Sequence, residues 1–87
     1  MVEILDFYAE WCGPCKMLSN TLEQIESEME GLKIERVDVD SEDARVEKYG
    51  IQNLPTIIIS EDGVEKERIV GNRSKNDLIE IFKQYVQ

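Results

Sequence analysis

The two cysteines of this chain stand two residues apart, in the segment EWCGPCK at residues 10–16. A pair this close could bind a metal ion, close a short loop or exchange electrons with another disulfide. A structural zinc site needs four ligands, and the chain offers two thiols and no histidine. A disulfide across so small a loop restrains the unfolded chain little. The spacing therefore favours thiol–disulfide exchange.

The two thiols would have different tasks in such an exchange. A short apolar strand ends just before the pair, and a helix is expected to open near Cys12 to Cys15. The free N–H groups and macrodipole of a helix start favour an anionic sulfur at Cys12. Cys15 lies one turn further in and is placed to attack the mixed disulfide formed at Cys12. Gly13 permits a tight turn, and Pro14 suits the first helical turn because it has no N–H.

The elements that would position this pair follow from the apolar pattern. Leu18, Leu22, Ile25 and Met29 recur at helical spacing, and Asp62-Gly63 is a hairpin signal. We expect strands at 2–9, 32–40, 56–60 and 64–71, and helices from about residue 12–15 to 31, at 41–50 and at 74–87. The order β-α-β-α-β-β-α predicts an α/β fold, a four-stranded mixed sheet with helices on both faces. Residues 1–87 would form a single domain.

The ends of the helices also have sequence signals. Gly31 stands where the first helix would end, and Gly50 where the second would end. Asp40 or Ser41 could cap the start of the second helix. Ser74 and Asp77 resemble a capping box at the start of the third.

Composition excludes some classes of partner. The net charge is −9, with 19 acidic against 10 basic residues, and such a surface repels phosphate backbones. We therefore expect no nucleic acid partner. No apolar run approaches the roughly 20 residues of a membrane span, so we expect no membrane association. The N-terminus lacks a basic leader and a cleavage site, which predicts a cytoplasmic protein without a signal peptide.

Three segments, DFYAEWCGPCKM, KYGIQNLPTIII and RIVGNRSKNDL, resemble the landmarks of the thioredoxin family in their order and spacing. The similarity runs from about Val2 to the C-terminus and implies a thioredoxin-like fold. Only 11 residues precede Cys12, so the leading strand and helix of that fold are expected to be missing. Asn20 stands where the family commonly has a proline that kinks the active-site helix, and we expect a straighter helix here.

Asp6 stands inside an apolar strand, where a carboxylate is costly unless it is paired, hydrated or neutral. The resemblance implies a buried catalytic aspartate at this position, acting as general base when Cys15 attacks. It also implies that Trp11 is an apolar wall beside Cys12 that contacts substrate. Arg36 stands where the family usually has a lysine near the aspartate. If Arg36 approaches Asp6, it should lower the pKa of that carboxyl, but strand parity alone leaves its face open.

The second and third landmarks imply a substrate groove. By resemblance, Pro55 is a cis proline beside the cysteine pair, and the backbone of Leu54 pairs with an extended substrate segment. Gly71 would border the same groove, and Gly13 and Pro14 would also be substrate-binding residues. Asn53 stands where the family commonly has a glycine, which alters the groove rim.

The resemblance implies a protein-disulfide reductase of the thioredoxin type. Its partners would be disulfide-containing proteins and a thioredoxin reductase or similar electron donor, and it would be a monomer without a cofactor or metal. The Gly-Pro dipeptide between the cysteines resembles reducing members of the family. Two alternatives stay open: a glutaredoxin-like reductase that uses glutathione, and a thioredoxin-fold adaptor subunit of a partner protein.

Overall fold

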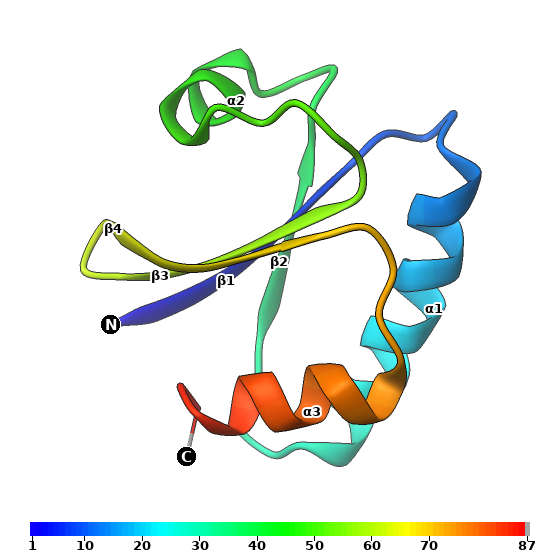
Figure 1. The fold of residues 1–87 in the computed structure, drawn as a ribbon, viewed down its shortest axis with the longest axis vertical. Helices are drawn as coiled ribbons and strands as arrows, with labels where there is room; N and C mark the ends of the chain where they lie inside the picture. The colour runs from blue at the N-terminus through cyan, green and yellow to red at the C-terminus, as the bar shows by residue number, and fades with distance from the viewer. Residues whose placement is uncertain (87) are drawn as a thin grey trace.

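Four strands form one mixed sheet in the computed structural model of the chain, which describes residues 1–86 (Figure 1). The spatial order of the strands is β2-β1-β3-β4. Strand β1 pairs in parallel with β2 and antiparallel with β3, and β3 pairs antiparallel with β4. The strands are β1 (Val2–Tyr8), β2 (Ile34–Asp38), β3 (Thr56–Glu61) and β4 (Val64–Val70). The predicted four-stranded mixed sheet is confirmed.

Three helices cover the two faces of this sheet. They are α1 (Gly13–Glu28), α2 (Asp43–Tyr49) and α3 (Lys75–Lys83). Figure 1 shows α1 and α3 on one side of the sheet and α2 on the other. The buried clusters agree, because Leu22 of α1 and Phe82 of α3 pack with Ile57, whereas Tyr49 of α2 packs with Phe7.

Strand β1 lies inside the sheet and is buried on both faces. Alternate residues face opposite sides of a strand, so Ile4 packs toward α1 and α3 while Leu5 and Phe7 pack toward α2. This explains why the strand is an apolar run rather than an alternating pattern. Asp6 is the one acid within that buried stretch. Its register partners on the adjacent strands are Arg36 of β2 and Ile57 of β3.

The apolar stripe predicted for the first helix is its buried face. Leu18, Leu22 and Ile25 are all buried, and α1 continues without interruption through Asn20, which is expected when no proline removes a backbone donor. The helix ends at Glu28, with Met29 as its C-cap, so the expected cap at Gly31 is wrong. Gly31 instead adopts a φ of 85° in the turn that follows, where a glycine is favoured.

Other helix and turn predictions have mixed outcomes. Helix α2 begins after Glu42, whose side chain makes no cap hydrogen bond, so the cap expected from Asp40 or Ser41 is wrong. Gly50 does end α2, in the left-handed conformation. The Asp62-Gly63 turn joins β3 to β4, with φ values of 53° and 84°, which are the two positive angles of a type I′ hairpin.

The last helix is shorter than predicted. Ser74 caps it by accepting a hydrogen bond from the N–H of Asp77 at 3.1 Å. The prediction extended the helix to residue 87, but α3 ends at Lys83. Residue 87 itself lies outside the described residues. None of the helices in residues 1–86 has the length and hydropathy that a membrane crossing requires.

Candidate redox-active site

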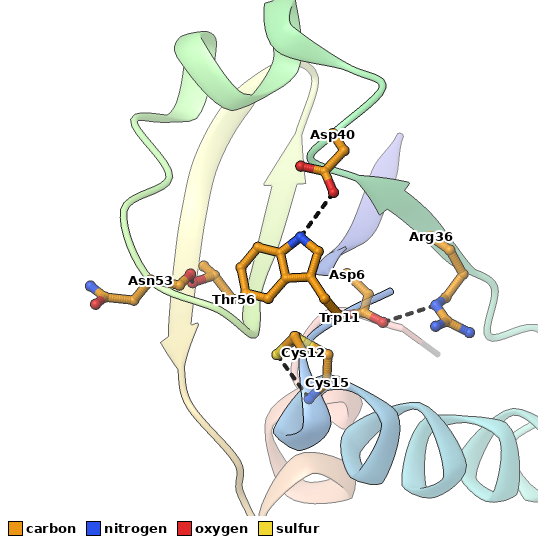
Figure 2. Close-up of a disulfide and its surroundings, with 8 residues drawn as sticks. All are labelled: Asp6, Trp11, Cys12, Cys15, Arg36, Asp40, Asn53 and Thr56. Carbon is orange, nitrogen blue, oxygen red and sulfur yellow. Dashed lines mark hydrogen bonds and ion pairs between the residues drawn. A yellow bond between two sulfur atoms is a disulfide. The ribbon is translucent and has the colours of Figure 1, made fainter. Parts of the chain in front are cut away.

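The two cysteines lie at the start of α1 and form a disulfide (Figure 2). Cys12 is the N-cap of the helix, and its Sγ accepts a hydrogen bond from the N–H of Cys15 at 3.2 Å. Gly13 and Pro14 occupy the first two helical positions, where an N–H would have no partner inside the helix and a proline therefore costs nothing. The local sequence thus places one sulfur on the helix end and the other a turn behind it.

The surroundings of the pair favour an anionic Cys12 when the disulfide is reduced. The first turn of α1 contains no acidic side chain, so the positive end of the helix is not neutralised by a carboxylate of its own. The N–H of Cys15 already points at the Cys12 sulfur, and a donor in that position stabilises a thiolate. Cys12 is 6% exposed and Cys15 2%, so Cys12 is the more accessible of the two.

Asp6 is buried next to Arg36. The carboxyl is 1% exposed, and its Oδ2 lies 3.0 Å from Nε of Arg36. Neither carboxyl oxygen has a hydrogen-bond partner within residues 1–86, so the contact with Arg36 is an ion pair whose N–H is not aligned with the oxygen. Burial raises the pKa of Asp6 from 3.8 to about 6, and the charge of Arg36 acts in the opposite direction. The guanidinium does approach Asp6, which strand parity had left open.

A pocket of about 480 Å³ opens beside the Asp6–Arg36 ion pair. Its walls include Cys15 from α1 and Arg36 from β2, so the inner cysteine and the ion-pair partner of Asp6 line one opening. Polar side chains make up most of the remaining wall, namely Tyr8, Glu10, Lys16, Ser19 and Asn20. Water entering this pocket would reach the vicinity of both Cys15 and the Asp6–Arg36 pair.

Trp11 stands in front of the pair and is 72% exposed. Its Nε1–H donates to Oδ2 of Asp40 at 3.0 Å, as Figure 2 shows. Asp40 follows β2 and lies 29 residues away in the chain, and sequence reasoning treated it only as a helix cap. No local pattern signals this contact, because it depends on how the end of β2 is placed beside the β1–α1 loop. The hydrogen bond fixes the orientation of a large exposed indole.

The loop before β3 brings Leu54 against the cysteines. Leu54 packs on the buried cluster of Ala9, Cys12 and Cys15, and the Leu54–Pro55 peptide bond is cis. The carbonyl of Pro55 accepts a hydrogen bond from the N–H of Gly71 at 2.9 Å.

A side-chain hydrogen bond also holds this loop in place. The Thr56 hydroxyl donates to the carbonyl of Asn53 at 2.6 Å, a contact that sequence reasoning did not anticipate. Gly71 has a φ of 83°, and a Cβ added to it would meet no atom within 4 Å. A side chain at position 71 would therefore stand in open space next to Pro55. The fold thus brings the three landmark segments together around the disulfide.

The donor set does not resemble a metal centre. Within the part of the chain that the structure describes, no group of three or more His, Cys, Asp or Glu side chains is placed to hold a metal ion. The chemistry that the arrangement offers is that of two vicinal sulfurs, a buried carboxyl of raised pKa and an exposed indole.

Comparison with known proteins gives one consistent result. The family model described as Thioredoxin matches residues 2–84. The thioredoxin of Chlamydia caviae is 44% identical over 82 residues, which cover 94% of this chain and 80% of that protein. The thioredoxin of Bacillus subtilis is 40% identical over 86 residues, which cover 98% and 83%. A solved structure of a mutant thioredoxin from Halobacterium salinarum, 34% identical, superposes with a TM-score of 0.87 over 99% of this chain and 75% of that one.

Proposed function

Because the chain belongs to the thioredoxin family and is a thiol–disulfide oxidoreductase, we propose that it reduces disulfides in protein substrates. The observation that carries this proposal is the position of Cys12 at the N-cap of α1, with Cys15 one turn behind it. That arrangement gives one activated sulfur and one that is held back.

In the first step Cys12 is the nucleophile. Its thiolate attacks one sulfur of the substrate disulfide, a bond forms between the two sulfurs, and the other substrate sulfur leaves as a thiolate that takes up a proton. The helix start and the N–H of Cys15 stabilise the attacking anion. The substrate is then held to the protein through a mixed disulfide at Cys12.

In the second step Cys15 resolves the mixed disulfide. The Cys15 thiol gives its proton to Asp6, its sulfur attacks Cys12, and the second substrate sulfur leaves with both electrons of the broken bond. Asp6 suits the role of general base, because a carboxyl with a pKa of about 6 is mostly ionised at pH 7 yet remains a better proton acceptor than an ordinary aspartate. The product is the Cys12–Cys15 disulfide present in the structure.

An extended segment of the substrate would lie against the surface that Trp11, Leu54, Pro55 and Gly71 present near the disulfide. Leu54 offers its backbone for strand-like pairing next to the cysteines. The absence of a side chain at Gly71 leaves space beside Pro55. Gly13 and Pro14, between the two cysteines at the start of α1, would contact the same segment.

We further propose that the protein works as a single-domain monomer in the cytoplasm. Each cycle leaves it oxidised, so a thioredoxin reductase or similar donor must return two electrons to the disulfide. The chemistry of the site needs no cofactor, because the electrons pass between sulfur atoms alone.

A disulfide-reduction assay on insulin tests the function. With dithiothreitol as electron source we expect turnover by the native chain and none by Cys12→Ser. Cys15→Ser is the matched variant, because it keeps the nucleophile and should trap a covalent complex with substrate that mass spectrometry detects. Turnover that survives Cys12→Ser, or a covalent substrate complex trapped at Cys15 in that variant, would contradict the mechanism.

The same assay separates the two alternatives. Turnover with glutathione alone, at a rate close to that with dithiothreitol, would support the glutaredoxin-like alternative. An adaptor subunit would show no turnover with either reductant. We expect activity with dithiothreitol and little with glutathione, because the acidic surface is a poor host for an anionic tripeptide.

A further inference from the structure

We propose that Tyr8 is a positioning residue for the resolving step, because its ring holds the Arg36 guanidinium against the Asp6 carboxylate. This inference rests on the proposed role of Asp6 as the base for Cys15. It assigns a task to a side chain that neither the sequence nor the chemistry of the cysteines singled out.

The three groups form a compact arrangement on two neighbouring strands. Asp6 and Arg36 are direct partners in the parallel pairing of β1 with β2. Tyr8 lies two residues after Asp6, so both side chains project from the same face of β1. The guanidinium carbon of Arg36 lies 4.6 Å from the centre of the Tyr8 ring, while its Nε lies 3.0 Å from Oδ2 of Asp6.

Arg36 needs such a support because of its place in the sheet. Strand β2 is an edge strand of the sheet, next to β1, and the Arg36 side chain is 39% exposed. An arginine with access to water has many alternative rotamers to occupy. Its contact with Asp6 is an ion pair without an aligned hydrogen bond, which does not by itself define one orientation. The face of an aromatic ring attracts and orients a guanidinium.

Other charged groups surround the pair and set the background for the test. Glu10 from the β1–α1 loop and Lys16 from α1 line the same pocket as Arg36 and Tyr8. On β2, Asp38 lies two residues after Arg36 and is the register partner of Tyr8, so it is on the same face, whereas Glu35 is paired with Arg45. From α1, Cys15 also lines the pocket, and its sulfur is in the disulfide of the oxidised protein used for the test. On the β3 side the partner of Asp6 is Ile57, which does not titrate.

The position of Arg36 matters for Asp6 because a nearby positive charge opposes the effect of burial on the carboxyl. If the ring is lost, the guanidinium is free to turn toward water, and its mean distance from Asp6 increases. The carboxyl then keeps its proton to a higher pH. A ring that merely filled space would have the opposite effect, since its removal would admit water and ease ionisation.

The experiment follows the Asp6 carboxyl by carbon-13 NMR during pH titration of the oxidised full-length protein, with Asp6→Asn used to assign its resonance. We expect Tyr8→Leu to move the titration midpoint upward by roughly 0.5 to 1 pH unit, and Arg36→Gln to move it at least as far. Tyr8→Phe is the matched control, because it keeps the ring, and should leave the midpoint in place. Tyr8→Met removes the ring with less loss of volume and serves if Tyr8→Leu does not fold.

The double variant Tyr8→Leu/Arg36→Gln provides the decisive comparison. If the ring acts through Arg36, the double variant titrates like Arg36→Gln alone. The inference is overturned if Tyr8→Leu leaves the midpoint unchanged or lowers it, or if its effect persists in full without Arg36.

A second readout keeps this inference separate from the proposed function. The pH dependence of the resolving step should move with the NMR midpoint in Tyr8→Leu. If the midpoint moves as expected but the rate profile does not, Tyr8 holds Arg36 against Asp6, but Asp6 is not the base and Tyr8 has no role in the resolving step. If Cys12→Ser retains activity, the mechanism fails whatever the titration shows.

Discussion

Replacing Asp6 by asparagine should stabilise the oxidised protein at neutral pH. The fold places this carboxyl where it is 1% exposed and has no aligned hydrogen-bond donor within residues 1–86. Burial without sufficient compensation makes the ionised form costly, and the pKa is accordingly raised from 3.8 to about 6. At pH 7 the folded protein therefore contains a carboxylate in an environment that favours the protonated acid.

The size of the effect follows from the two pKa values. The folded state binds the proton more tightly than the unfolded state, so stability is lost as pH rises from about 4 to about 6. The full loss above that window is about 3 kcal/mol, because one pH unit corresponds to about 1.4 kcal/mol. At pH 4 the loss is only about 0.5 kcal/mol. Asparagine cannot ionise, so Asp6→Asn should gain about 2.5 kcal/mol more at pH 7 than at pH 4.

Urea unfolding of both proteins at pH 4 and pH 7, with the disulfide intact, measures this difference directly. The comparison between pH values cancels the cost of burying an amide, since that cost applies at both. Arg36 loses its ion-pair partner in the variant. Because the Arg36 side chain is partly exposed and stays hydrated, losing this ion pair costs little stability. Asp43→Asn, at an exposed position in the first turn of α2, is the matched control for the loss of one carboxylate. An equal effect of Asp6→Asn at the two pH values would refute the argument.

Three further predictions concern the framework of the site. Phe82→Ala should lower the free energy of unfolding by roughly 3–5 kcal/mol, because the ring is fully buried between α3 and the sheet; a loss below about 1 kcal/mol in urea would mean that the core is not packed as described. Arg68→Gln should cost about 1–2 kcal/mol, because the guanidinium donates to the carbonyls of Tyr49 and Gly50 at the end of α2, and unchanged hydrogen exchange in α2 would argue against this. Gly71→Ala should cost about 1–2 kcal/mol through its positive φ alone; the thermal midpoint should fall, and a rise would show that the backbone relaxes there.

Much of the fold was readable from the sequence because it depends on short-range patterns. The stripe through Leu18, Leu22 and Ile25 predicted the buried face of α1, and the Asp62-Gly63 pair predicted the hairpin. These signals involve residues within one or two turns of each other, so neighbouring backbone geometry alone determines them. The boundaries were less accurate, because a cap such as Glu42 of α2 has no side-chain hydrogen bond to mark it.

The position of the cysteine pair was likewise a local matter. A helix that starts shortly after a buried strand, with Pro14 in its first turn, puts Cys12 at its N-cap. The chemistry of the site, thiol–disulfide exchange, therefore followed from the segment 10–16 and its neighbours.

Tertiary structure determines which side chains contact Asp6 and Trp11 and so adjust the chemistry of the site. In β2 the adjacent residues Glu35 and Arg36 are both exposed, so alternation could not tell which of them faces Asp6. Tyr8 reaches Arg36, and Trp11 reaches Asp40, across 28 and 29 residues of chain. Those contacts require one register between two parallel strands that are joined through a helix rather than a tight turn. Packing of the whole sheet against α1 and α2 sets that register, and no segment of the sequence specifies it alone.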